Sequence, residues 1–399
     1  MTETDSDGLR ADRTATNQDC SGVADLRRVG VDPNYWYPVA VAKKVRAGRV
    51  VAAEFAGERL ALYRGRSGAV HALEDRCAHR QIPLSMGVVE GEVLRCRYHA
   101  WAYRGDGRIS QIPYLSKEDR RPPRGVRSYP VREAYGFVFI FPGDPERAGA
   151  TALPELPAHG SPAYKTLTYS RTVRCHYSFM HENLLDMNHQ FLHQGVVGRL
   201  RPELLGHRSS ARSVEARYLF THTGGKRNAG ASLLAAEGIA GGSRDVMTIR
   251  TEYPYQTLDL VPEGADDAVF SLWAAYVPKG ADQRTCHVYG LLMIKKPRVP
   301  AVLGLASPLI RRFTERVFAQ DRMAVEAEQR AWEEQGEDRN HEVFSLILDV
   351  REALRSNGVP LTGSVRSRDT DSFACPAGAA GTCGSGRPDH AQPGPATGH

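Results

Sequence analysis

Two short cysteine–histidine segments place the strongest constraint on how this chain can fold. Cys77–His79 reads Cys-Ala-His, and Cys96–His99 reads Cys-Arg-Tyr-His after a gap of sixteen residues. Alternating apolar runs flank both segments, so each is expected on a loop between β-strands. Two loops that bring two thiols and two imidazoles together can hold a single zinc ion or a [2Fe–2S] cluster. The fold must therefore place these two loops side by side.

Three features of the loops favour the cluster over zinc. The gap of one residue between Cys77 and His79 is shorter than in the usual zinc-finger hook, and the histidines alternate with the cysteines along the chain. Ile82–Gly87, Tyr98 and Trp101 supply small and apolar side chains that can keep water from the sulfides. Imidazoles in place of two thiolates make a cluster less negative, which raises its reduction potential from about −400 mV to roughly −150 to +300 mV.

A second candidate metal motif lies within Glu182–His193, which reads Glu-Asn-Leu-Leu-Asp-Met-Asn-His-Gln-Phe-Leu-His. Helix positions four apart share one face, so His189 and His193 can bind the same ion. Two histidines and one carboxylate in a facial arrangement hold Fe(II) and leave coordination positions open. Two alternatives remain: His176 or His181 replaces one of the pair, or both members of the pair are ordinary helix histidines.

Composition is that of a globular protein, with 41% hydrophobic and 25% charged residues among 399. The sequence has no apolar run long enough to span a membrane and no apolar signal core near Met1, so we expect a cytoplasmic protein. The net charge of +6 is modest and comes without a dense basic block, which argues against nucleic-acid binding. Seven scattered cysteines without a secretory signal favour metal binding over a disulfide framework.

Periodicity divides the chain into an all-β part and a mixed part. Short alternating runs predict strands near 50–55, 59–63, 69–73, 92–96 and 135–140, and later near 246–249 and 268–277. Helices are predicted over 176–193, 311–335 and 342–356. The expected order is a flexible arm (1–33), a β domain (34–145), a Pro/Ala/Gly-rich linker (146–163), a mixed domain (164–360) and a disordered tail (361–399).

The two cysteine loops resemble the cluster-binding loops of Rieske non-haem iron oxygenase α-subunits. This resemblance implies that Cys77, His79, Cys96 and His99 bind a Rieske [2Fe–2S] cluster. One departure is Ala100, because members of the family commonly have glycine at that position. It bears on the local conformation of the loop.

The segment with the two histidines is similar to the mononuclear iron motif of the same family. The resemblance implies that His189 and His193 are iron ligands, that Asn183 lies near the iron, and that Asp186 is the carboxylate that bridges the two metal centres across a subunit boundary. The chain departs from the family by placing three residues, where four are usual, between the histidines. Either the helix geometry differs or one histidine is not a ligand.

The third ligand must come from a distant segment. Phe318–Gln329 is similar to the late helix that carries this ligand in the vanillate-demethylase-like branch, and the resemblance implies that Asp321 is the metal-binding carboxylate. Glu326 and Glu328 are lesser candidates. The alternative for Asp321 is an exposed helix aspartate paired with a nearby arginine.

The resemblance implies an α+β fold, with an N-terminal all-β Rieske domain and a helix-grip (START-like) catalytic domain built on an antiparallel sheet. It also implies a homotrimer, O2, a small organic substrate, and electrons from a ferredoxin or an NAD(P)H-dependent reductase, since no GxGxxG fingerprint is present. The strands near Trp273 and Tyr276 are expected to line the pocket. Monooxygenation or demethylation is the expected reaction. The alternatives are an oxidative cyclase or desaturase, for example of the prodiginine type, and an electron carrier with a degenerate second site.

Overall fold

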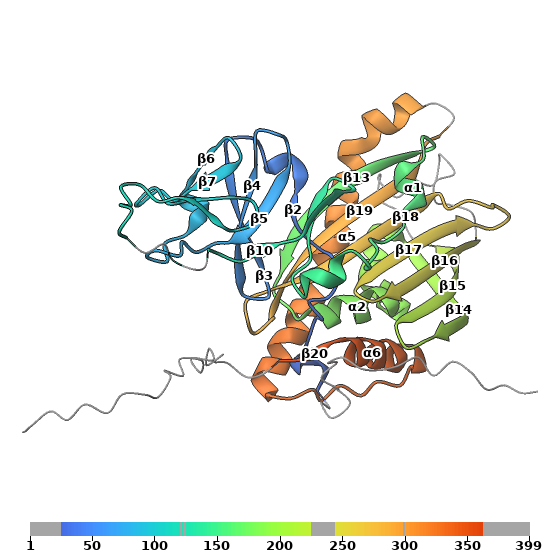
Figure 1. The fold of residues 1–399 in the computed structure, drawn as a ribbon. Coiled ribbons are helices and arrows are strands. Elements are labelled where there is room, and N and C mark those ends of the chain that lie inside the picture. Colours follow the sequence, from blue (N-terminus) through green and yellow to red (C-terminus); the bar gives the residue numbers. More distant parts are fainter. Residues whose placement is uncertain (1–24, 120–121, 123–124, 225–243, 298–299, 362–399) are drawn as a thin grey trace, which may run out of the picture. The chain divides into compact units, whose positions relative to one another are not determined.

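The computed structural model describes residues 25–119, 122, 125–224, 244–297 and 300–361 (Figure 1). Nearly all of the tail that we expect to be disordered, 361–399, lies outside the described residues, and so do residues 1–24 of the expected arm. Among the described residues, no helix combines the length and the apolar character that crossing a membrane requires.

The N-terminal region consists of short antiparallel strands. They form three sheets with the strand orders β10-β5-β4-β3, β11-β12-β2 and β6-β7-β8-β9. The hairpin predicted near 50–63 is formed by β3 and β4, which are joined by Ala56 and Gly57 with φ of 46° and 85°. Positive φ at both positions is the type I′ geometry that fits the twist of a hairpin. The strands are β2 (Tyr37–Val41), β3 (Val50–Phe55), β4 (Glu58–Arg64), β5 (Val70–Glu74), β6 (Val88–Glu90), β7 (Val93–Arg95), β8 (Ala102–Tyr103), β9 (Ile109–Gln111), β10 (Ser128–Tyr129), β11 (Val131–Ala134) and β12 (Phe137–Ile140).

The C-terminal region is built on a seven-stranded antiparallel sheet with the order β13-β19-β18-β17-β16-β15-β14. Helices α2, α3 and α6 contact this sheet (Figure 1). The expected class, α+β with an antiparallel sheet and covering helices, is therefore confirmed. The strands are β13 (Tyr164–Val173), β14 (Arg199–Ser209), β15 (Ser213–Gly224), β16 (Arg244–Glu252), β17 (Tyr255–Pro262), β18 (Phe270–Lys279) and β19 (Thr285–Lys295); the helices are α2 (Tyr177–Leu185), α3 (Gln190–Val197), α5 (Pro300–Gln335) and α6 (Ser345–Asn357).

Alternation along β18 separates two faces of this sheet. Tyr276 lines a cavity on one face. Trp273 points to the other face, where its ring lies 6.2 Å from the rings of Phe137 and Phe139. Because side chains alternate along a strand, β18, the strand expected to line the pocket, does so through Phe270, Leu272 and Tyr276 and not through Trp273.

The segment 176–193 is not the single helix that its composition predicts. Helix α2 ends at Leu185, Asp186 is extended (φ −82°, ψ 91°), and the 3-10 turn η6 (Met187–His189) leads into α3. The Asp186 carboxylate accepts a hydrogen bond from the Asn188 N–H (2.9 Å) and so caps the new turn. Aspartate favours such a cap over a place inside a helix, which explains the break.

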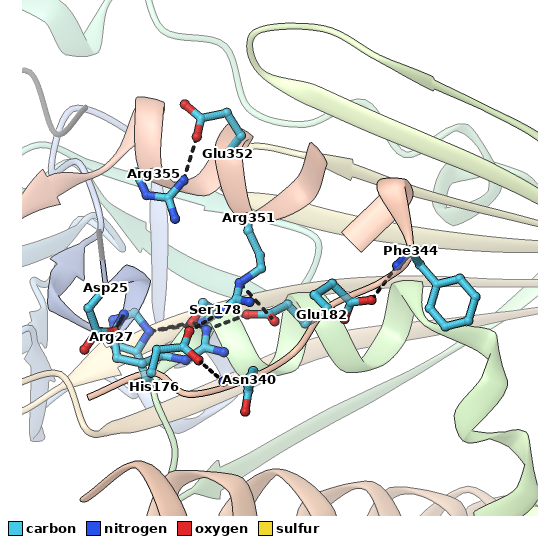
Figure 2. Close-up of polar contacts among 12 residues, drawn as sticks. Asp25, Arg27, His176, Ser178, Glu182, Asn340, Phe344, Arg351, Glu352 and Arg355 are labelled. Atoms are coloured by element: carbon cyan, nitrogen blue, oxygen red, sulfur yellow. Dashed lines mark hydrogen bonds and ion pairs between the residues drawn. The ribbon is translucent and has the colours of Figure 1, made fainter. Parts of the chain in front are cut away.

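Residues 25–33, which we expected to belong to the flexible arm, are packed into the fold. Leu26 and Val29 are completely buried, and strand β1 (Val29–Gly30) pairs with β20 (Val359–Pro360). The buried Arg27 side chain contacts Ser178 and, at 2.5 Å, Glu182 of α2 (Figure 2). These contacts attach the segment to the C-terminal region.

Two further segments contain more helix than their composition predicts. The expected linker holds η5 (Pro145–Ala148) and the short α1 (Pro157–Gly160). Helix α5 begins at Pro300, before the predicted 311, and continues through Pro308. The added turns bury Leu303 and Ile310 against apolar residues of the sheet, so packing rather than propensity accounts for them.

Candidate metal centres

The two cysteine loops share one pattern of backbone hydrogen bonds. The Cys77 N–H donates to the carbonyl of Ile82 (2.9 Å), and the Cys96 N–H donates to the carbonyl of Trp101 (2.8 Å), five residues on in both cases. In each loop, the residue four positions after the cysteine donates back to the cysteine carbonyl, at 2.8 and 3.1 Å. The loops are therefore two copies of one tight turn, although the histidine follows by two residues in one copy and by three in the other.

Both turns need a residue in the left-handed region. Gln81 has φ of 59° and Ala100 has φ of 56°. A glycine adopts this conformation without the contact between Cβ and the backbone that penalises other residues. This explains why glycine is preferred at position 100. The position requires the conformation that glycine favours, and Ala100 adopts it here at a cost.

The two cysteines and the two histidines of these loops differ in burial. Cys77 and Cys96 are buried, and burial, together with the neighbouring Cys77 thiol, raises the pKa of Cys96. His79 and His99 are exposed with ring centroids 4.5 Å apart. The His79 ring also stacks on Trp101 at 4.7 Å with an interplanar angle of 4°. A sulfur pair inside and a nitrogen pair outside fit a cluster that has both cysteines on one iron and both histidines on the other.

Tyr103 is a neighbour of this site that the sequence did not identify. Its hydroxyl oxygen accepts a hydrogen bond from the Ala78 N–H (3.0 Å) and lies 3.1 Å from the Cys77 sulfur. Burial, together with the contact to Cys77, raises the pKa of Tyr103 above its usual value, so the phenol keeps its proton. It can therefore donate that proton in a hydrogen bond to a cysteine thiolate.

The second candidate centre joins residues that are far apart in the sequence. The Nε2 atoms of His189 and His193 lie 3.6 and 3.0 Å from one carboxylate oxygen of Asp321 on α5. The three ligand atoms all lie within 4.8 Å of one another, which makes this the one such group of three or more histidine, cysteine or acidic residues within the described part of the chain. The altered spacing of the histidines thus leaves both of them facing Asp321.

The opposite ring nitrogens are held by acceptors. Nδ1 of His189 contacts the Asp186 carbonyl, and Nδ1 of His193 lies 2.9 Å from Oε1 of Gln320. Each Nδ1–H can donate to its acceptor, which leaves the Nε2 lone pair for a metal; metal-binding histidines are usually oriented in this way. The sequence did not identify Gln320, and its position beside Asp321 was the one available signal.

The electrostatic environment of this group attracts a cation. Burial lowers the pKa of His193, but the Asp321 carboxylate and Gln320 more than offset burial, so the net shift is upward. The Nε2 of His193 and the Oδ1 of Asp321 are buried and, apart from their 3.0 Å contact with each other, have no hydrogen-bond partner in the described structure. Two imidazole nitrogens and one carboxylate that face each other in this way fit Fe(II).

The other candidate residues lie elsewhere. Nδ1 of His176 is 2.8 Å from the Ser178 hydroxyl. Burial lowers the pKa of His181 to about 3, and its ring packs against Tyr276. Glu326 accepts a hydrogen bond from a backbone N–H of another segment. None of these, nor Glu328, belongs to the metal-binding group described above.

The two residues expected to assist the iron occupy different positions. Asn183 lies on the wall of the cavity. The Asp186 carboxylate, which we expected to contact a ligand histidine, accepts hydrogen bonds from Asn188 instead, and its backbone carbonyl contacts His189. The contact between this segment and His189 is thus made by the main chain.

The candidate iron ligands lie on the wall of a cavity of about 350 Å³, between the sheet and helices α2, α3 and α5. This volume is typical of sites for small organic molecules. Most of the lining is apolar, and it includes Leu258, Leu260, Phe270, Leu272, Leu292 and Phe318.

Comparison with known proteins decides the family. Residues 35–130 match the Rieske [2Fe–2S] domain, and residues 173–354 match the vanillate O-demethylase oxygenase C-terminal domain. A 4β-methylsterol monooxygenase of Methylococcus capsulatus is 33% identical over 338 residues, which are 80% of this chain and 88% of that protein. The chain belongs to the Rieske non-haem iron oxygenases. The resemblance seen in its sequence is confirmed.

Other relatives agree with this assignment. The oxygenase component of dicamba O-demethylase from Stenotrophomonas maltophilia is 35% identical over 162 residues, so the match spans 40% of this chain and about half (47%) of that relative. A crystal structure of dicamba monooxygenase has the same fold, with a TM-score of 0.65 and 24% identity over 84% of this chain and 97% of that one. This Rieske oxygenase is therefore an iron-dependent oxidoreductase whose cofactors are a [2Fe–2S] cluster and a mononuclear iron.

Proposed function

We propose that this Rieske oxygenase is the terminal component of a multi-component monooxygenase that oxidises a small, largely apolar organic substrate. The observation that carries the proposal is that His189, His193 and Asp321 converge on the wall of an apolar cavity. Such a wall excludes water from the reacting atoms and orients a substrate by contact.

In this proposal Cys77, Cys96, His79 and His99 hold the cluster. His189, His193 and Asp321 hold the iron. When bound, the cluster supplies single electrons and the iron supplies activation of O2. The chain contributes the ligands, the Nδ1 acceptors that orient both histidines, and the apolar walls that position the substrate.

The remaining residue roles concern the delivery of electrons to the iron. We assign Asp186 as the bridge between the cluster of one subunit and the iron of a neighbour in a head-to-tail homotrimer, and Asn183 as a residue that contacts the iron site. Asp186 starts η6 and touches His189 through its carbonyl, which supports a role beside the iron. A ferredoxin or an NAD(P)H-dependent reductase supplies the electrons, in the cytoplasm.

Substrate class is proposed from the cavity and from the relative that covers most of the chain. The lining is apolar, and that relative is a 4β-methylsterol monooxygenase. We therefore propose oxidation of a methyl or other C–H carbon of a polycyclic substrate. Labelled O2 separates this reaction from cyclisation or desaturation, because only oxygen insertion leaves the label in the product.

Metal analysis tests the two sites. Protein purified without oxygen is expected to contain about three irons and two acid-labile sulfides per chain, from one cluster and one mononuclear iron. A count of two irons, with a normal cluster spectrum and no O2 uptake, would indicate an electron carrier and reject the proposal.

Turnover tests the reaction itself. The iron-loaded protein, a ferredoxin, a reductase and NAD(P)H are combined with 18O2 and a 4-methylsterol. Uptake of O2 coupled to a labelled product is expected. For a variant that lacks the Asp321 carboxylate, the matched control is Glu326→Gln, because Glu326 is on the same helix as Asp321 but outside the metal-binding group.

A further inference from the structure

Gln190 is a buried polar side chain on the cavity wall whose amide oxygen has no partner. It is the first residue of α3, it is only 5% exposed, and it lines the cavity together with His189 and His193. Its Oε1 atom is buried and accepts no hydrogen bond within the described part of the chain. A buried amide oxygen without a partner is unfavourable, and most such atoms in proteins have one. The partner of this oxygen is therefore expected among the molecules that the cavity binds.

A metal at the candidate iron site does not need this oxygen. His189, His193 and Asp321 already provide the two imidazoles and the carboxylate of a facial site. Such a site keeps its other coordination positions open for O2 and substrate. The Gln190 amide is therefore left for the substrate itself.

The position of Gln190 on α3 places its amide close to the iron ligands. Residues three apart lie on one face of a helix, so Gln190 and His193 point to the same side of α3. Along the helix axis they are separated by about 4.5 Å, at 1.5 Å per residue. Both side chains line the cavity. A substrate group bound by Gln190 would thus lie near the carbon that is oxidised, and not at the opposite end of the substrate.

The chemistry of a carboxamide limits which substrate groups can satisfy it. A glutamine side chain accepts hydrogen bonds at Oε1 and donates them from Nε2. A hydroxyl group can donate to Oε1 and accept from Nε2 at the same time. A carbonyl or ether oxygen can only accept, and a hydrocarbon can do neither, so each of them leaves Oε1 unpaired. Among neutral oxygen-containing groups, a hydroxyl is therefore the one that satisfies this amide.

We propose that Gln190 binds a hydroxyl group of the substrate and so sets which carbon faces the iron. The hydroxyl O–H donates to Oε1 of Gln190, and the hydroxyl oxygen accepts from Nε2. The substrate is then an otherwise apolar alcohol, oxidised at a carbon a few bonds from the hydroxyl. This inference rests on the proposed function and adds the chemical class of the substrate, the residue that selects it and the position that is oxidised.

Binding of three sterol probes tests the inference. They are a 4-methylsterol, whose methyl group is on the carbon next to the one that bears the hydroxyl, the deoxy sterol with hydrogen in place of that hydroxyl, and the matching ketone. Dissociation constants are measured on the full-length, iron-loaded protein without reductant. The alcohol is expected to bind about 10-fold more tightly than the deoxy sterol, which leaves the buried amide unpaired. The ketone is expected to bind several-fold more weakly than the alcohol, because it cannot donate to Oε1.

One variant assigns these preferences to Gln190. Gln190→Leu replaces the amide by a hydrocarbon of similar size, so the ratio of the dissociation constants of the alcohol and the deoxy sterol should approach one. The deoxy sterol should bind several-fold more tightly to Gln190→Leu than to the unaltered protein, a gain that misfolding cannot produce. Gln194→Leu is the matched control, because Gln194 is on the same helix but does not line the cavity. This control should keep the preference for the alcohol.

Equal binding of the alcohol and deoxy sterols by the unaltered protein would overturn the inference, and so would an unchanged preference in Gln190→Leu. Equal binding of the alcohol and the ketone would overturn the role of the hydroxyl as donor, and absence of binding by all three probes would overturn the inferred substrate class. Loss of the third iron in Gln190→Leu, without a change in preference, would show that the amide serves the metal instead.

These results are distinguishable from failure of the proposed function. That function stays intact if the unaltered protein contains three irons and inserts labelled oxygen, whichever sterol it prefers. Failure of the metal count would instead reject the proposed function, whatever binds beside Gln190. With the 4-methylsterol, the label is expected in the methyl group next to the hydroxyl-bearing carbon. A label at the opposite end of the sterol would contradict the position that Gln190 is proposed to set.

Discussion

The two candidate metal centres are built in opposite ways. The cluster loops lie within Cys77–Trp101 and consist of two copies of one turn, each closed by hydrogen bonds over four and five residues. The iron centre joins α3 to a helix whose nearest contributing residue, Gln320, is 127 residues from His193. The first site is fixed by local backbone geometry and the second by packing between distant elements. The effects of substitutions at the iron centre should therefore depend on tertiary contacts, whereas the effects of substitutions in the cluster loops should stay within those loops.

Removal of Asp321 is expected to have the largest effect. Asp321→Ala leaves two histidines without the carboxylate that completes a facial site. The mononuclear iron should be lost and turnover should fall at least about 100-fold. Iron and sulfide analysis should show about two irons and two sulfides per chain, with an unchanged cluster spectrum. Retention of the third iron would show that Asp321 is not a ligand.

The buried ion pair between Arg27 and Glu182 of α2 tests how much a contact between distant segments contributes to the stability of the fold. Glu182 lies 2.5 Å from Arg27 and 3.6 Å from Arg351 (Figure 2). Glu182→Gln leaves two largely buried arginines without this counter-charge, which should lower the free energy of unfolding by about 3–5 kcal/mol. Denaturant unfolding measures the change, and Glu337→Gln, in an exposed pair with Arg339, should cost only about 0–1 kcal/mol. Similar costs for both variants would contradict a structural role for the buried pair.

Gln320 provides a smaller test of the same centre. Gln320→Leu removes the acceptor for the Nδ1–H of His193, so the imidazole is no longer held in the metal-binding tautomer. The affinity for Fe(II) should fall by about 10- to 100-fold while the fold is retained. Metal titration monitors the change, and Gln320→Glu, which keeps an acceptor oxygen, should restore most of the affinity. Equal affinity in Gln320→Leu would show that Asp321 alone orients His193.

The sequence predicts most where the chemistry is local. Cys77 and Cys96 could be named as candidate ligands because the spacing of short motifs determines a tight turn. His189 and His193 could also be named as candidates. The break in the helix at Asp186 could not be predicted, because the free energies of a helix that continues through Asp186 and of a turn capped by its side chain differ little. Asp321 was inferred from a family resemblance, since no spacing rule connects it to the histidines.

Contacts between distant segments account for the residues that sequence reasoning missed. Arg27 meets Glu182 across 155 residues, and no local pattern indicates that pairing. Phe220 and Met247 line the same cavity because of the register of β15 with β16. A shift of that register by one residue would turn the cavity-lining side chains of one of the two strands to the other face. A sequence alone does not determine the register.

Tyr103 tests whether a change beside the cluster stays local. Tyr103→Phe removes the O–H that can donate to the Cys77 sulfur, which stabilises the more negative, reduced cluster. The reduction potential should fall on the order of tens of millivolts, as measured by redox titration, with iron content unchanged. Tyr63→Phe is the matched control, because its buried hydroxyl donates to the Glu92 carbonyl and not to a cysteine. An equal shift in both variants would argue that packing, not the hydrogen bond, sets the potential.

Ala100 is expected to give the smallest effect and the most local one. An alanine with φ of 56° is destabilised by roughly 1–2 kcal/mol in the left-handed conformation. A glycine avoids this cost, but part of the gain is lost because glycine increases the conformational entropy of the unfolded chain. Ala100→Gly should therefore stabilise the cluster loop by about 0.5–1 kcal/mol, seen as a higher temperature for the loss of cluster absorbance. Ala78→Gly, at a position without positive φ, should lower that temperature. Since the turn is closed by its own hydrogen bonds, neither variant should change the mononuclear iron content; a loss of that iron would mean that the two centres are less independent than their construction indicates.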